Sequence, residues 1–237
     1  MVATYSTFRP VTAWDRLLLY FGVEPDQEVT ALDPFSLGLA PFIRVGESGS
    51  GGKVCRDVVY GLFPQWAEMQ YGRNTFNSRC ETVAQLRSFR EAWRKGRRCI
   101  VPVEALFEPC YESGKPERCC LKRPGGEPMG VAGMWERMPS IDARWIFTFS
   151  MVTVKAASHP VYGRMNKPDQ EKRMPVILDS NEYGHWLSCS VDRAPEFFRQ
   201  WTGQLEMSAA PLSAALRASR AFEERNDAPP PESRAPS

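Results

Sequence analysis

Six short runs rich in β-branched and aromatic residues, separated by turn sequences, constrain the fold of this 237-residue chain more than any other feature. Glycine and proline mark the turns, as in SGK at 113–115, PGG at 124–126 and KPD at 167–169. Only one strong helical pattern interrupts this series of strands, so the sequence shows no βαβ alternation and favours antiparallel pairing. The sequence therefore predicts a mainly antiparallel β core, closed into a barrel or a sandwich. The expected strands are 58–63, 99–107, 119–122, 129–135, 146–154 and 174–178.

Helical spacing of apolar residues occurs in only a few segments. The first is 12–21, where Thr12 is a suitable N-cap and Gly22 ends the pattern. The other expected helices are 88–95, 181–187 and 194–201. We therefore predict an α+β fold, in which one compact domain over 1–216 has a β-barrel-like core and a few peripheral helices.

The remaining residues and the overall composition narrow the class of protein. Residues 217–237 include APPP and few apolar side chains, which predicts a disordered tail. The chain is 43% hydrophobic and has a net charge of +2, as expected for a globular protein. It has no long apolar run, and its first residues lack the pattern of a signal peptide. We therefore expect a cytoplasmic monomer with no membrane contact.

Cysteine and histidine are placed unfavourably for metal binding. The seven cysteines form no C-x-x-C pair, and His159 and His185 each stand alone. An odd number of cysteines without an export signal favours reduced thiols over disulfides. No Walker loop, G-x-G-x-x-G sequence or nucleophile elbow occurs. We therefore expect no metal and no cofactor.

A basic segment runs from 87 to 98. Six lysine or arginine residues and one acid, Glu91, give it a net charge of +5, although the whole chain carries only +2. One interpretation is a solvated helix face, and the other is a surface that follows the phosphates of a nucleic acid. The concentration of positive charge in an almost neutral chain favours the second interpretation, with Arg87 and Arg90 among the expected DNA contacts.

Three further segments carry side chains that suit a binding site. YGLFPQW at 60–66 is either a corner of the core or a platform on which bases stack. In NSRCET at 77–82, the polar residues either cap a helix or place Asn77 and Arg79 in a cleft. Glu108 ends an apolar run, where it is either solvated or a carboxyl group suited to acid–base chemistry.

Taken together and in this order, these segments resemble the SRAP (SOS response-associated peptidase) family, whose members process abasic sites in DNA. The family patterns are WGLxPxW, NARxET, RRCLVP followed by a glutamate, AGLWE and RMPVIL. The similar segments here are YGLFPQW (60–66), NSRCET (77–82), RRCIVP (97–102) with Glu108, AGMWE (132–136) and RMPVIL (173–178). The resemblance extends from the first residues to about residue 201.

The resemblance implies binding and processing of abasic sites in single-stranded DNA. In the family, the thiol and α-amine of a cysteine at position 2 close a thiazolidine with the ring-opened sugar, and an Asn, a Glu and a His complete the site. Asn77 and Glu108 correspond to the first two, whereas Val2 stands at the cysteine position and Asn166 at the histidine position. The residues expected to contact DNA are Arg79 at a phosphate, Trp66 and Pro41 near the bases, and Arg87, Arg90 and Arg164.

Two functions stay open. In the first, the protein is an enzyme: the Val2 amine, exposed once Met1 is removed, forms a reversible Schiff base while Glu108 assists proton transfer. In the second, the protein is a catalytically degenerate member that shields single-stranded DNA, because valine lacks the thiol and an amide cannot shuttle a proton. His159 could replace the histidine only through a rearranged loop, and Cys80 and Cys110 carry no α-amine. With only Met1 before Val2, the peptidase activity of the family would require no self-cleavage here.

Overall fold

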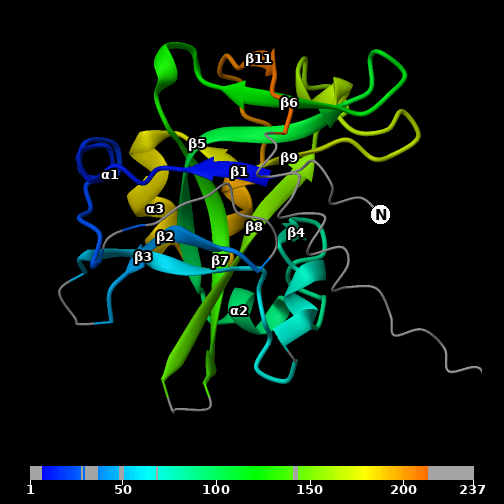
Figure 1. Ribbon diagram of the computed structural model, residues 1–237. Helices are drawn as coiled ribbons and strands as arrows, with labels where there is room; N and C mark the ends of the chain where they lie inside the picture. The colour runs from blue at the N-terminus through cyan, green and yellow to red at the C-terminus, as the bar shows by residue number, and fades with distance from the viewer. Residues whose placement is uncertain are drawn as a thin grey trace, which may run out of the picture.

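The computed structural model describes residues 7–27, 29, 37–47, 51–67, 69–140 and 144–212. These residues form one compact α+β domain in which strands predominate (Figure 1). The strands are β1 (Thr7–Pro10), β2 (Leu39–Val45), β3 (Lys53–Tyr60), β4 (Asn77–Arg79), β5 (Arg98–Cys110), β6 (Glu117–Lys122), β7 (Met129–Pro139), β8 (Trp145–Lys155), β9 (Arg173–Pro175), β10 (Ile177–Leu178) and β11 (Glu206–Ala209). The α-helices are α1 (Trp14–Phe21), α2 (Arg90–Arg94) and α3 (Tyr183–Ser188), and the 3₁₀ helices are η1 (Met69–Asn74), η2 (Pro124–Gly126), η3 (Tyr162–Arg164), η4 (Ser180–Glu182) and η5 (Ala194–Phe197).

A closed barrel of β5, β7, β8, β3 and β2 forms the centre of the domain. All neighbours in the barrel are antiparallel except β3 and β8, and the pair Ile43–Ile100 between β2 and β5 completes the closure. The remaining strands extend this barrel: β1 and β6 pair with β5, β11 with β6, β10 with β7, and β4 and β9 with β8. The predicted α+β class and the mainly antiparallel barrel-like core are therefore confirmed.

The central strand β5 is buried on both of its faces. β5 pairs with β1, β2, β6 and β7, and all but two of its side chains, Glu104 and Glu108, are buried. A strand covered on both faces has a continuous apolar sequence, not an alternating one. This explains the uninterrupted run at 99–107 and leaves the half-buried Glu108 near the end of the strand.

All six predicted strands overlap observed ones, with shifted boundaries. The run at 58–63 belongs to the end of β3, which begins at Lys53, and the run at 174–178 divides into β9 and β10. The sequence patterns missed β1, β2, β4 and β11. β4 has the sequence NSR and β2 contains Pro41 and Arg44, so neither looks like a strand, and both form because they pair with long neighbours.

The helices differ more from the prediction. α1 begins at Trp14 with Ala13 as its N-cap, so the prediction of Thr12 as the cap was wrong; Gly22 does end the helix in the left-handed conformation. The helix expected at 88–95 has only five residues, and the one expected at 194–201 is the 3₁₀ helix η5. Residues 217–237, the predicted tail, lie outside the described residues. No helix among the described residues is long and apolar enough to cross a membrane.

Gly61, which follows β3 in the YGLFPQW segment, has a backbone that other residues rarely adopt. Its φ is +127°, and a Cβ atom there would lie 2.5 Å from the carbonyl oxygen of Gly72. We expect Gly61→Ala to lower the free energy of unfolding by about 3 kcal/mol, from backbone strain and from the clash with a main-chain atom. Gly114→Ala is the matched control, since Gly114 also has a positive φ but nothing within 4 Å of its Cβ position. Urea unfolding measures both, and an equal loss in the two variants would contradict the clash.

Candidate functional site

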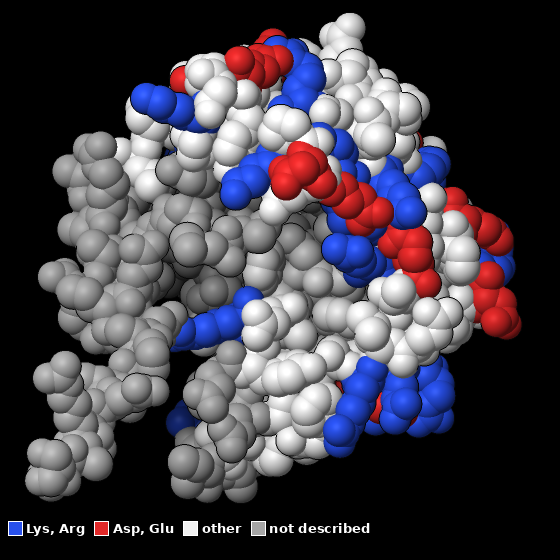
Figure 2. Space-filling view, turned by 90° about the vertical axis from the view of Figure 1, so that its right-hand side faces the viewer, with Lys and Arg blue, Asp and Glu red and all other residues white. Residues whose placement is uncertain are grey.

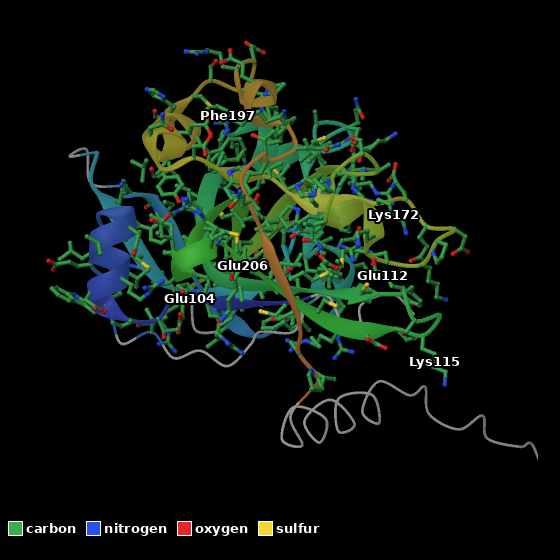
Figure 3. All side chains as sticks on the ribbon, turned by 90° about the horizontal axis from the view of Figure 1, so that it is seen from above. Glu104, Glu112, Lys115, Lys172, Phe197 and Glu206 are labelled. Carbon is green, nitrogen blue, oxygen red and sulfur yellow. The ribbon has the colours of Figure 1, made fainter. Side chains whose placement is uncertain are left out.

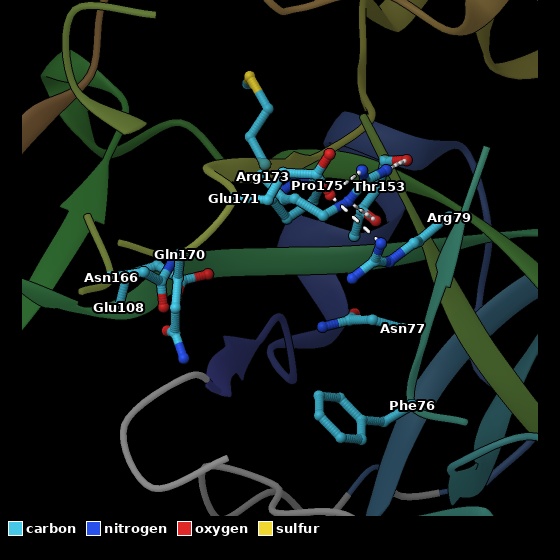
Figure 4. A pocket seen from close by; sticks show the side chains of 11 residues that line it. Phe76, Asn77, Arg79, Glu108, Thr153, Asn166, Gln170, Glu171, Arg173 and Pro175 are labelled. Carbon is cyan, nitrogen blue, oxygen red and sulfur yellow. Dashed lines mark hydrogen bonds and ion pairs between the residues drawn. The ribbon is translucent and has the colours of Figure 1, made fainter. Parts of the chain in front are cut away.

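A pocket of about 320 Å³ lies where β4, β9 and the end of β5 meet (Figure 4). It brings together three residues that are far apart in the sequence, Asn77, Glu108 and Asn166, and adds Arg79. The complete lining is Phe76, Asn77, Arg79, Glu108, Thr153, Asn166, Gln170, Glu171, Arg173, Met174 and Pro175.

Strand alternation directs Asn77 and Arg79 into the pocket. In β4 the middle residue, Ser78, is buried and donates its hydroxyl hydrogen to the carbonyl of Met151, while its two neighbours are exposed. Side chains two residues apart on a strand lie on the same face. Figure 4 shows both side chains extending from β4 toward Glu108 and Asn166 on the opposite wall. Of the two interpretations of this segment, the cleft is the one that the structure supports.

Glu108 forms the opposite wall near the end of β5. It is half-buried, and its charge contributes, after burial itself, to raising the pKa of two buried tyrosines, Tyr60 and Tyr162. Its carboxyl group therefore lies near two buried tyrosines and also lines the pocket. This is an environment in which a carboxyl group can exchange a proton with a bound ligand.

A backbone hydrogen bond to β5, the strand that carries Glu108, holds Asn166 at the pocket. Its N–H donates to the carbonyl of Pro109 at 2.7 Å, next to Glu108. Its φ of +61° lies in the left-handed region, which asparagine tolerates better than most residues. The ammonium of Lys172 donates to the Asn166 carbonyl at 3.0 Å and holds the loop in place.

His159 organises this loop and does not line the pocket. Its ring is buried: Nε2 lies 3.0 Å from the carbonyl oxygen of Trp201, and Nδ1 accepts the N–H groups of Val161 and Tyr162. Two accepted hydrogen bonds at Nδ1 place the proton on Nε2, so the ring is neutral, and burial lowers its pKa. The structure thus assigns His159 the turn role and gives no support to its use as a replacement for the missing histidine.

Arg173 ties two of the sequence blocks together at the rim of the pocket. Its guanidinium donates to both carboxylate oxygens of Glu81, at 2.8 and 3.3 Å, to the hydroxyl and carbonyl oxygens of Thr153, and to Glu171 at 3.0 Å. The pKa of Glu171 is lowered chiefly by its hydrogen bond from Arg173. The sequence patterns contained both blocks but did not show that they meet, and they missed Glu171 and Gln170 altogether. The one available signal was the charged run EKR at 171–173.

The basic segment 87–98 divides into a buried and an exposed part. Arg97 forms an ion pair with the buried Glu136, and the buried Arg98 donates to the carbonyls of Cys189 and Ser190. Two of the six positive charges thus hold the fold together.

The other four basic side chains of this segment are exposed: Arg87, Arg90, Arg94 and Lys95. The last two form ion pairs with Glu91. The predicted surface with a charge of +5 is therefore smaller than the sequence suggested. Figure 2 shows basic and acidic side chains mixed in the middle of one face, with a second basic group below.

The other predicted DNA contacts are not among the residues that line this pocket. Trp66 is 47% exposed, with the Arg87 guanidinium 4.1 Å from its ring centre, and it lines a second pocket of about 340 Å³. Pro41 is buried in β2 opposite Asp57, where it cannot stack on a base without rearrangement.

Arg164, the last of the predicted DNA contacts, forms an ion pair with Glu112. Figure 3 shows Glu112 on the side of the molecule opposite Glu104 and α1. Val2 lies outside the described residues.

Neither cysteine near the mapped residues is placed to act as a nucleophile. Burial and the charge of Glu81 raise the pKa of the Cys80 thiol to about 11, and Cys110 is buried. Neither lines the pocket that holds Asn77 and Glu108. In the part of the chain that the structure describes, no three His, Cys, Asp or Glu side chains group as metal ligands.

These features define a single-domain β-barrel protein with a polar, charged pocket beside the end of its central strand. A sequence model of the SOS response associated peptidase (SRAP) family matches residues 14–218, and the chain belongs to this family. It is similar to the abasic site processing protein HMCES from Gallus gallus (24% identical over 57% of this chain and 45% of the relative) and from Rattus norvegicus (23% over 60% and 47%). The chain thus spans about half the length of these curated relatives.

Solved structures share the fold. A protein from Bordetella bronchiseptica is 30% identical with a TM-score of 0.80, and the match covers 87% of this chain and all of that one. A protein from Bacteroides thetaiotaomicron is 21% identical with a TM-score of 0.71, over 86% of this chain and 92% of that one, and shows the shared fold.

Proposed function

We propose that this protein binds abasic sites in single-stranded DNA and processes them in the pocket of Asn77, Arg79, Glu108 and Asn166. The observation that supports the proposal most strongly is the pocket itself, because it gathers these four side chains from three distant segments. The family and the names of the curated relatives point to the same substrate.

Each side chain has a role that its chemistry allows. Arg79 is a permanent cation and suits a backbone phosphate, while the amides of Asn77 and Asn166 hydrogen-bond the oxygens of the opened sugar. Glu108 takes the proton that an attacking amine must lose and returns it to the departing water. The products of this step are an imine and one water molecule, and hydrolysis reverses it.

The attacking amine in this proposal is the α-amine of Val2. In β1, Thr7 pairs with Phe107, the residue before Glu108. Five residue steps of at most about 3.6 Å each separate positions 2 and 7, so the amine has a reach of about 18 Å from Thr7. An α-amine has a pKa of about 7.7–8.0 and is partly unprotonated at neutral pH, as a nucleophile must be.

Borohydride trapping tests the proposal. The protein is incubated with labelled single-stranded DNA that contains one abasic site, and borohydride reduces any imine to a stable amine. We expect an adduct with the wild-type protein and a rate lowered by about 100-fold or more in Glu108→Gln, since an amide of the same shape cannot transfer protons. Binding of the same DNA, followed by fluorescence anisotropy, should change much less.

Glu104→Gln is the matched control, because Glu104 lies half-buried on the same strand but pairs with Arg16 of α1. Its trapping rate should equal that of the wild type. Binding without any trapped adduct would instead support the degenerate, shielding protein. Absence of binding to single-stranded DNA at low salt would exclude both functions.

A further inference from the structure

The carboxylate of Glu171 lies among three cations at the rim of the pocket. Its Oε2 atom is 3.3 Å from Nη1 of Arg79 and 3.0 Å from Nη1 of Arg173, and its Oε1 atom is 3.4 Å from Nζ of Lys155. The dashed lines in Figure 4 connect Glu171 to the two arginines. Three cations that converge on two oxygens are also an arrangement that can bind a phosphate group.

The three cations differ in how they are held. Arg173 is fixed by Glu81 and Thr153 without any help from Glu171. Arg79 and Lys155 are 61% and 67% exposed at the side chain, and within the described residues Glu171 is the only carboxylate that forms an ion pair with either. If Glu171 moved away, one cation would stay in position and two would become available to a ligand.

Glu171 itself is able to move. Its side chain is 37% exposed, and its ion pairs with Arg79 and Lys155 lie at the surface, where such pairs contribute little to stability. Only its third partner, Arg173, has a largely buried side chain. A phosphodiester that brings its own negative charge therefore competes with the carboxylate on nearly equal terms.

We propose that Glu171 occupies the position of a DNA phosphate and is displaced when single-stranded DNA binds, so that it acts as a built-in competitor that weakens binding. The proposal rests on the proposed function, because it assumes that DNA enters this pocket. It assigns Lys155 as a phosphate-binding residue that becomes available only after the displacement.

Anisotropy with a short labelled oligothymidylate that has no abasic site tests this without any covalent chemistry. We expect Glu171→Gln to bind about tenfold more tightly than the wild type at low salt, since the phosphate no longer has to break exposed ion pairs worth a factor of a few each. The slope of log K against log[salt] should steepen by about 0.7 for each additional phosphate that the freed cations neutralise. In Arg79→Ala/Glu171→Gln most of the increase in affinity should disappear.

Glu196→Gln is the control: it removes the same charge from an exposed ion pair, with Arg193, outside this pocket. It should bind like the wild type. If Glu171 only supports the fold, Glu171→Gln and Glu171→Ala will melt at lower temperature and bind no better, and the proposal is overturned. If the wild type binds and Glu171→Gln binds equally, the competitor role alone fails, whereas no binding by any variant also removes the proposed function.

Discussion

Replacing Val2 by cysteine is expected to turn a reversible encounter with abasic DNA into a lasting covalent adduct. In the wild type, the proposed imine hydrolyses. In Val2→Cys the thiol adds across the C=N bond of that imine, with sulfur bonding to carbon and its hydrogen passing to nitrogen, which closes a thiazolidine. A thiol on the residue that carries the amine has an effective concentration on the order of 10⁵ M or more, so ring closure outcompetes hydrolysis.

The measurement is denaturing electrophoresis without borohydride, together with intact mass to establish that Met1 has been removed. We expect no persistent band for the wild type, although it contains seven other cysteines, because none of them carries an α-amine. Val2→Ser, which has a side chain of similar size without the thiol, should behave like the wild type. If Val2→Cys with a free amine forms no adduct, the pocket does not bring the amine to the sugar, and the enzymatic form of the proposal is wrong.

Trp186→Ala should produce the largest loss of stability among single substitutions outside the pocket. The indole of Trp186 is fully buried, packs edge-on against Phe197 with ring centres 5.5 Å apart, and donates its N–H to the carbonyl of Cys99 at 2.8 Å. It thus joins α3 to β5. Removing it leaves a large cavity and abolishes this hydrogen bond, and we expect the free energy of unfolding to fall by about 3–5 kcal/mol.

Urea unfolding followed by circular dichroism measures this loss. Trp186→Phe should cost less, about 1–2 kcal/mol, because an aromatic ring remains and mainly the hydrogen bond is lost. Trp145→Ala is the control, since Trp145 is 50% exposed at the start of β8 and its removal should cost under about 1 kcal/mol. A loss in Trp186→Ala no greater than in the control would show that α3 contributes little to the stability of the barrel.

The sequence predicted most of the barrel because its long strands carry their own signal. Runs such as 99–107 and 146–154 are apolar, β-branched and bounded by turns, and each overlaps a long strand. β4 carries no such signal. Its three polar residues become a strand only by pairing in parallel with β8, whose partner residues lie about 74 positions later in the chain.

The sequence identified only part of the candidate site, for the same reason. Asn77 and Glu108 were identified through motifs that resemble a family, and both line the pocket. Glu171 lay in no motif, and it acquires its proposed role only because β9 and β4 both pair with β8 and thereby bring Arg173 and Arg79 to it.

Local chemistry and tertiary structure therefore determined different properties of this protein. The sequence by itself determined the long central strands, the fold class and the family, because periodicity, turn residues and motifs are properties of neighbouring residues. It also determined the absence of a thiol at position 2. Tertiary structure decided which charges face solvent: Arg97 and Arg98 look like their neighbours in the sequence, but Glu136 and the carbonyls after α3 hold them in the interior. The partner of a charged side chain is chosen by strand pairing across long distances in the chain, and that pairing is fixed only when the barrel closes.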